Sequence, residues 1–201
     1  SELCLKLLER MLHLYRSGNF FAKPNCINFN AVLMAYSRGK SKEAAERAVE
    51  MLAKMERPDF DGGYDVEPDR FSYALTILAC ARCPDIVYAA NMSEAILEKM
   101  EERARIEAKK KEEISSAAPP AVTLDIESFN AVLTAISKSR QPDSVARIMA
   151  IIRRMEDYAK QGMDAVAPNI RSWNAVLRSL SKARGRNLGE RSEQILNHMF
   201  E

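Results

Sequence analysis

Apolar residues recur at helical spacing in four separate stretches of the chain. In the first stretch, 26–40, they occupy positions i, i+3, i+4 and i+7: Phe29, Val32, Leu33 and Tyr36. This spacing places them on one face of an amphipathic helix. The same spacing recurs in 70–83, 126–140 and 170–186. Each stretch therefore predicts an amphipathic helix of the same kind.

A six-residue motif marks the start of each of these helices. It reads NFNAVL at 28–33, SFNAVL at 128–133 and SWNAVL at 172–177, with a divergent copy, SYALTI, at 72–77. The copies begin 44, 56 and 44 residues apart. Such internal similarity predicts an array of repeats rather than one globular core.

A second helix is predicted after each first one, and it ends near a methionine preceded by an aliphatic residue at i−3. The five pairs are Leu8/Met11, Leu52/Met55, Leu97/Met100, Ile152/Met155 and Leu196/Met199. From the third motif residue to the methionine of the same repeat the chain counts 25, 26, 25 and 25 residues. Helix lengths are thus constant, and length varies in the loops.

These signals predict an all-α fold, a right-handed α-solenoid of stacked helical hairpins over residues 1–201. One hairpin cannot bury its apolar face alone, so neighbouring hairpins must stack. Residues 1–25 form the second half of a preceding repeat, and three repeats follow at 26–69, 70–125 and 126–169, with a truncated one at 170–201. The second repeat contains an insertion at 101–121, in which a charged tail extends the helix and a Ser/Ala/Pro-rich linker follows.

The composition is typical of a helical protein, and it argues against a transmembrane protein and a disulfide-rich secreted one. Hydrophobic residues make up 47% of the chain, with only seven Gly and eight Pro. No apolar run is long enough for a transmembrane helix, and no targeting segment is visible. Four cysteines in 201 residues do not indicate a disulfide scaffold, so a reducing compartment is expected.

The net charge of +2 conceals an uneven distribution. The four first-helix stretches carry eleven Lys and Arg residues and a single acid, Glu127, whereas acids outnumber cations in the second-helix stretches. Because stacked hairpins place all first helices on one side, this pattern predicts a basic surface that attracts a phosphate backbone.

Four of these cations recur eight residues after the third motif position: Arg38, Arg82, Lys138 and Lys182. They are candidates for contacts with phosphate groups. The alternative is that they complement the negative end of a helix dipole.

The turns before the first helices complete a recognisable layout. They read Lys23-Pro24-Asn25, Glu67-Pro68-Asp69 and Ala167-Pro168-Asn169, while the third boundary keeps only Leu124-Asp125. Together with the aromatic-Asn motif and the closing Met, they make the chain resemble the pentatricopeptide repeat family. The resemblance implies single-stranded RNA binding, about one base per repeat, in mitochondria or chloroplasts, for RNA processing, stability or translation.

The resemblance also implies which residues contact RNA. Base-reading pairs are Asn30 with Asp69, Ala74 with Asp125, and Asn130 with Asn169, while Asn25 and Asn174 lack a partner. Residues that sandwich the bases are Ile27, Phe71 and Arg171, with Glu127 in the equivalent place of the third repeat. The alternative for the motif asparagines is a local hydrogen bond, and for Asn25, Asp69, Asp125 and Asn169 it is helix N-capping.

Other candidate chemistry is better explained by packing. The motif aromatics Phe29, Tyr73, Phe129 and Trp173 lie on the apolar faces and are expected in the core rather than stacked on bases. Cys80 and Cys83 have CxxC spacing, but two further zinc ligands are missing, so buried thiols are expected. Asp59, Asp61 and Asp65 do not follow the order of a calcium loop. No cofactor, metal, membrane contact or small-molecule substrate is expected.

The resemblance and the basic surface together predict a protein that binds single-stranded RNA in a sequence-selective way, without catalysis in this segment. Two alternatives stay open. One is a protein-binding scaffold, suggested by the charged tail at 101–113 and the long loops. The other is the RNA-binding arm of an enzyme whose catalytic domain lies outside the 201 residues.

Overall fold

The computed structural model describes residues 2–57, 64–114, 121–182 and 193. Within these residues the chain forms eight α-helices and two short 3₁₀ turns, and no strand is present. The predicted all-α class is confirmed for this part of the chain.

Four helices, the first helices, start where the repeated motif predicts them. They are α2 (Cys26–Arg38), α4 (Arg70–Ala81), α6 (Ile126–Ser139) and α8 (Ile170–Leu180). Each is preceded by a residue whose side chain accepts a hydrogen bond from the backbone N–H at the third helical position: Asn25, Asp69, Asp125 and Asn169. This bond satisfies an N–H group that a helix start leaves without a partner. The N-cap interpretation of these four residues is confirmed.

The other four, the second helices, follow the predicted apolar stripes. They are α1 (Glu2–Arg16), α3 (Lys42–Met55), α5 (Ile86–Ile114) and α7 (Ser144–Lys160). Ser41 caps α3 by accepting from the Ala44 N–H at 3.1 Å, and Asp85 accepts from the Tyr88 N–H at 3.1 Å at the start of α5. The 3₁₀ turns η1 (Phe20–Ala22) and η3 (Asp164–Val166) lie in the loops before α2 and α8.

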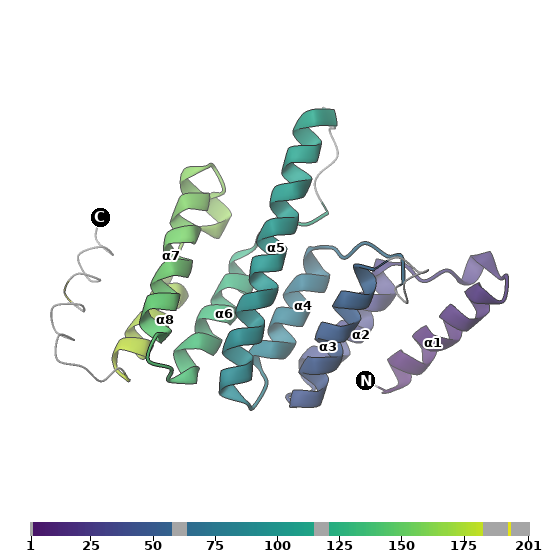
Figure 1. The fold of residues 1–201 in the computed structure, drawn as a ribbon, viewed down its shortest axis with the longest axis horizontal. Coiled ribbons are helices and arrows are strands. Elements are labelled where there is room, and N and C mark those ends of the chain that lie inside the picture. Colours follow the sequence, from purple (N-terminus) through teal and green to yellow (C-terminus); the bar gives the residue numbers. More distant parts are fainter. Residues whose placement is uncertain (1, 58–63, 115–120, 183–192, 194–201) are drawn as a thin grey trace.

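The helices pack in chain order. Consecutive first helices lie side by side, α2 against α4, α4 against α6, and α6 against α8. Each second helix after α1 contacts the first helix before it and the one after it, so that α3, α5 and α7 each cover a junction, meaning the contact between two consecutive first helices. In Figure 1, α3, α5 and α7 lie in front of the row of first helices. This arrangement gives the first helices one common surface on the side away from the second helices.

The motif aromatics belong to the core, as predicted. Phe29 and Phe129 are fully buried and Tyr73 is 2% exposed, while Trp173 is half-buried against the same apolar cluster. The closing methionines Met55, Met100 and Met155 are also buried. These side chains fill the space between the two layers of helices, which accounts for their recurrence in the sequence.

The second helix α5 is longer than its neighbours because it continues through the charged segment, as predicted (Figure 1). Its extension is held at its base by polar contacts. The carboxylate of Glu101 lies 3.0 Å from Arg154 of α7, and Arg103 forms ion pairs with Glu67 and Glu107. Glu107 also accepts a hydrogen bond from the Val122 N–H at 3.0 Å. Beyond this point Lys109, Lys110 and Lys111 are exposed.

Some predictions concern residues outside the described ranges. These are the linker at 115–120, Asp59 and Asp61 of the acidic loop, and the second helix predicted after residue 187. Among the helices that the structure describes, none combines the length and the apolar character needed to cross a bilayer.

Candidate nucleic-acid interface

The proposed base-reading pair Asn30 and Asp69 is brought together across the α2/α4 junction. The Asn30 amide donates to the two carboxylate oxygens of Asp69 at 3.0 and 3.2 Å. Its carbonyl oxygen accepts from the Ser72 hydroxyl at 2.8 Å. Ser72 in turn belongs to the capping box that starts α4, because its backbone N–H donates to Asp69 at 2.9 Å. One polar network therefore joins the end of one repeat to the start of the next.

The same network recurs across the α6/α8 junction. The Asn130 amide donates to Asn169 at 3.5 Å, and the Asn130 carbonyl oxygen accepts from the Ser172 hydroxyl at 2.8 Å. Asn169 and Ser172 form the capping box of α8. Asn130 is only 5% exposed, so a base edge can contact it only by displacing a bond of this network. Helix capping and repeat packing are thus roles that both pairs already perform, and base contact stays a prediction.

The carboxylate of Asp69 is stabilised by its network. Burial alone raises the pKa of Asp69, but the hydrogen bonds from the Ser72 backbone, the Asn30 amide and the Ser72 hydroxyl outweigh this effect. The pKa of Asp69 therefore lies below its ordinary value. The ionised form accepts the bonds that connect α2 to α4.

The remaining base-reading candidates have no such network. Asp125 caps α6 by accepting from Ser128, but Ala74 has no side-chain polar group with which to reach Asp125. Asn25 is exposed and shares a capping box with Asn28, and Asn174 is exposed on α8.

The four base-sandwiching positions all lie on the solvent-facing side of the first turn of a first helix. Ile27 is 73% exposed and Phe71 is 53% exposed, with the Arg70 guanidinium 4.4 Å from the Phe71 ring centroid. In the next two first helices, the equivalent residues Glu127 and Arg171 form an exposed ion pair with N–O distances of 2.9 and 3.0 Å. One half of this row offers apolar surface, whereas the other half is occupied by a salt bridge.

The four recurrent cations divide into two groups. Arg82 donates to the Ser37 carbonyl of α2 at 3.1 Å, and Lys182 donates to the Ser137 carbonyl of α6 at 3.1 Å. Each therefore binds the C-terminal end of the preceding first helix, where carbonyl groups lack partners. The helix-end alternative thus holds for these two, although the helix concerned is the neighbouring one. Lys138 forms no such bond with any residue the structure describes, and the Arg38 guanidinium contacts only the Met34 sulfur, at 3.6 Å.

Three further cations of the basic surface that the sequence predicted lie at the same helix ends: Lys40, Arg140 and Arg178. Together with the four recurrent cations they form the basic band, which comprises Arg38, Lys40, Arg82, Lys138, Arg140, Arg178 and Lys182. Desolvation, with the neighbouring charges of Arg140, Arg178 and Lys138, lowers the pKa of Lys182. An anion placed among these groups would relieve their mutual repulsion.

Lys40 and Arg140 share an unusual backbone conformation just after the ends of α2 and α6. Their φ angles are 43° and 57°, in the left-handed region that non-glycine residues adopt at a cost of about 1 kcal/mol. Each lies two residues after a recurrent cation, and this shared spacing was the sequence signal for them. A recurrent serine, Ser72, Ser128 and Ser172, was the corresponding signal for the polar networks.

The cations of the first helices and those of the second helices differ in whether they form ion pairs. Many, though not all, Lys and Arg residues of the second helices form ion pairs with nearby acids, as in Arg47–Glu43, Lys54–Glu50 and Arg147–Glu94. In the described part of the chain, the basic band forms no ion pair, and among the cations of the first helices only Arg171 has an acidic partner. The positive charge of the first-helix layer is therefore available to an external anion.

The cysteines offer no metal site in the described residues. Cys80 and Cys83 are buried, and burial, with a contribution from Cys83, raises the pKa of Cys80 to about 12. No group of three or more His, Cys, Asp or Glu side chains that could hold a metal occurs in the ranges the structure describes.

Comparison with known proteins adds no identification. The chain matches no protein-family model, and a search of curated proteins returned no significant match.

Proposed function

We propose that the chain is an α-solenoid that binds single-stranded RNA on its first-helix layer, without catalysis in this segment. The solenoid is supported by the order of the helix contacts, because in the described part of the chain the main contacts of each helix are with helices one or two places away in chain order. We propose a right-handed superhelix, as in the pentatricopeptide repeat family that the sequence resembles, and location in a mitochondrion or chloroplast on the same ground.

The observation that carries the proposal is the unpaired basic band. Seven cations lie at the C-terminal ends of successive first helices without a described acidic partner, while many cations of the second helices, such as Arg47, Lys54 and Arg147, form ion pairs. A structural role does not require unpaired charges, because mutual repulsion opposes folding. A polyanion that follows the row of helices releases its counterions on binding and so gains affinity.

The opposite end of the first helices suits bases rather than phosphates. Ile27 and Phe71 expose apolar side chains at equivalent positions of consecutive repeats, and Arg70 lies over the Phe71 ring. Exposed aromatic and aliphatic surfaces stack on bases with little sequence preference. We therefore place the bases toward the N-terminal ends and the phosphates toward the basic band.

The test is the salt dependence of RNA binding, measured by fluorescence anisotropy with a labelled pool of short single-stranded RNA. The variant Arg38→Gln/Lys138→Gln/Arg178→Gln removes three charges of the basic band. Each lost phosphate contact reduces the slope of log K against log salt by about 0.7. The matched control Lys6→Gln/Arg47→Gln/Lys54→Gln removes three exposed cations that are ion-paired on second helices.

The proposal requires a flatter slope in the first variant than in the control. Equal slopes in the two variants would remove the basic band from the interface. No RNA binding at low salt would contradict the proposed function itself.

A second candidate function is a protein-binding scaffold, favoured by the extension of α5. This helix continues beyond its neighbours (Figure 1). Its extension exposes Ile106 near the run Lys109, Lys110 and Lys111. RNA binding on the first-helix layer makes no use of this extension. Removal of residues 108–120 therefore leaves RNA affinity unchanged if RNA is the ligand, and abolishes partner capture if the scaffold function is correct.

A further inference from the structure

A pocket of about 310 Å³ lies at the α4/α6 junction. It is enclosed by the C-terminal end of α4, the first turn of α5 and the last turns of α6. Its side chains include three cations and three small or aliphatic residues: Lys40, Arg82, Lys138, Ile86, Ala89 and Ala135. No acidic residue belongs to this lining in the described part of the chain.

The pocket occurs where a cation–carbonyl contact is missing. At the α2/α4 and α6/α8 junctions, Arg82 and Lys182 reach the last turn of the preceding first helix. The equivalent acceptor for Lys138 is the carbonyl of Ala81, which itself lines the pocket. Because Lys138 forms no hydrogen bond with the described residues, its ammonium group is free to bind an anion.

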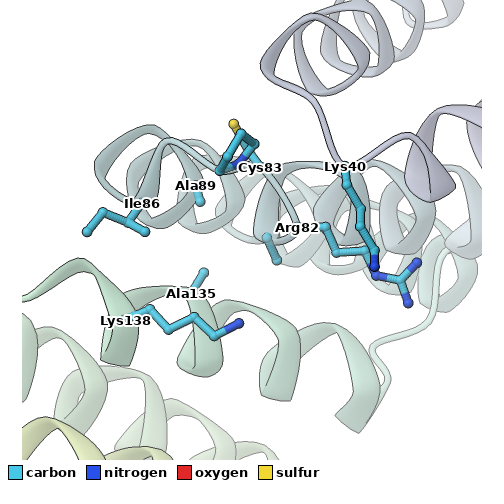
Figure 2. A pocket seen from close by; sticks show the side chains of 9 residues that line it. Lys40, Arg82, Cys83, Ile86, Ala89, Ala135 and Lys138 are labelled. Atoms are coloured by element: carbon cyan, nitrogen blue, oxygen red, sulfur yellow. The ribbon is translucent and has the colours of Figure 1, made fainter.

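The pocket has two chemically different sides. Figure 2 shows Lys40 and Arg82 together on one side, with the amine of Lys138 directed toward that side from α6. On the other side, the methyl groups of Ala89 and Ala135 face each other, with Ile86 farther out. The N–H groups of a guanidinium suit phosphate oxygens, and facing methyl groups suit a flat ring.

We propose that this pocket binds one nucleotide unit, with its phosphate at Lys40, Arg82 and Lys138 and its base between Ala89 and Ala135. A volume of about 310 Å³ lies at the lower end of the range for small-ligand sites, which fits a single nucleotide. The nucleotide is either a free one or a residue of a bound strand. The site lies at the ends of the first helices opposite Ile27 and Phe71, so it stands apart from the base-stacking row and does not depend on strand binding.

The first experiment titrates adenosine 5′-monophosphate into the full chain with methyl-labelled alanine and follows the NMR signals of Ala89 and Ala135. Both signals shift with saturation, and adenosine or inorganic phosphate alone binds at least about tenfold more weakly. The variant Lys138→Gln weakens nucleotide binding about tenfold or more. The matched variant Lys182→Gln, at the same position of a junction without the pocket, leaves nucleotide binding unchanged.

A second experiment distinguishes the two sources of the nucleotide, namely a free nucleotide and a residue of a bound strand. If a residue of the strand fills the pocket, Lys138→Gln weakens RNA binding more than Lys182→Gln does, and the free nucleotide competes with RNA. If a free nucleotide is the ligand, the two variants weaken RNA binding equally. Nucleotide binding without RNA binding would preserve the pocket and reject the proposed function. The absence of nucleotide binding, together with equal effects of the two variants on RNA, would overturn the pocket assignment.

Discussion

Side-chain hydrogen bonds connect the α2/α4 and α6/α8 junctions at both ends, whereas in the described residues the α4/α6 junction has such a bond at neither end. There, a backbone contact joins the start of α4 to the segment before α6, because the Arg70 N–H donates to the Ala121 carbonyl at 3.1 Å. At the N-terminal end, Asn30 and Asn130 bridge to the capping residues of the next repeat, and Ala74 takes their place in the middle. At the C-terminal end, Arg82 and Lys182 bind carbonyl groups, while Lys138 does not. We call the first two the tied junctions. No side-chain hydrogen bond joins α4 to α6 among the residues the structure describes.

The difference shows that side-chain hydrogen bonds between consecutive first helices are not needed to stack these hairpins. The α4/α6 junction is held by apolar packing, with Ile77, Val132 and Ile136 in its core, and by α5, which lies across it. Ion pairs of Arg147 and Arg154 connect α5 to α7 as well. A junction that relies on nonpolar contacts leaves its polar groups available, and the pocket lies at this junction.

The largest expected loss of stability follows from a substitution in a tied junction. The substitution Asn130→Ala leaves the buried Ser172 hydroxyl and the Asn169 side chain without a shared partner. The free energy of unfolding should fall by about 1–3 kcal/mol, the cost of unsatisfied buried polar groups. Urea unfolding followed by circular dichroism measures it, with the exposed Asn174→Ala as control. A loss no greater than that of the control would mean that the network does not hold the junction.

A smaller effect is expected from the recurrent cations. The substitutions Arg82→Met and Lys182→Met each remove one bond to a helix-end carbonyl and should lower the free energy of unfolding by about 0.5–1 kcal/mol. The substitution Lys138→Met should leave it unchanged, because Lys138 makes no such bond. The same urea titration compares the three variants. An equal loss in their free energies of unfolding would contradict the difference between the tied junctions and the α4/α6 junction.

The smallest expected effect is a difference between the two tied junctions in how their stability depends on pH. The lowered pKa of Asp69 means that its contribution to stability is present above its unfolded-state pKa of about 4 and is lost as pH falls through the folded-state value. In the equivalent position the amide of Asn169 does not titrate. Thermal unfolding between pH 6 and pH 3 should therefore show a shallower decline in Asp69→Asn than in the wild type. Parallel declines would show that Asp69 is not stabilised by its network.

Helices and repeat register were predictable because they depend on local spacing. The stripe that starts at Phe29 specified the buried face of α2, and the turn residues Asp69 and Asn169 specified helix starts. The pairing of Asn30 with Asp69 followed from the resemblance to the pentatricopeptide repeat family, although the hydrogen bonds between them and the role of Ser72 in joining them were missed. These features repeat in the sequence, so comparison of the copies was sufficient to predict the helices and the register of the repeats.

Which of the recurrent cations would bind a carbonyl group was not predictable, because the answer depends on how the preceding hairpin packs. Lys138 and Lys182 both follow a serine at the same position of a first helix, yet only Lys182 meets a carbonyl. The difference arises from how α4 and α6 approach each other, and this lies in tertiary packing rather than in local sequence. The pocket was missed for the same reason, since its lining comes from four separate segments.

The central claim is that single-stranded RNA lies along the first-helix layer. The most direct measurement is photo-crosslinking of the chain to RNA that carries 4-thiouridine, with mass spectrometry of the crosslinked peptides. The account predicts crosslinks in peptides of α2, α4, α6 and α8, with Phe71 among the modified residues. Crosslinks confined to α3, α5 and α7 would contradict it.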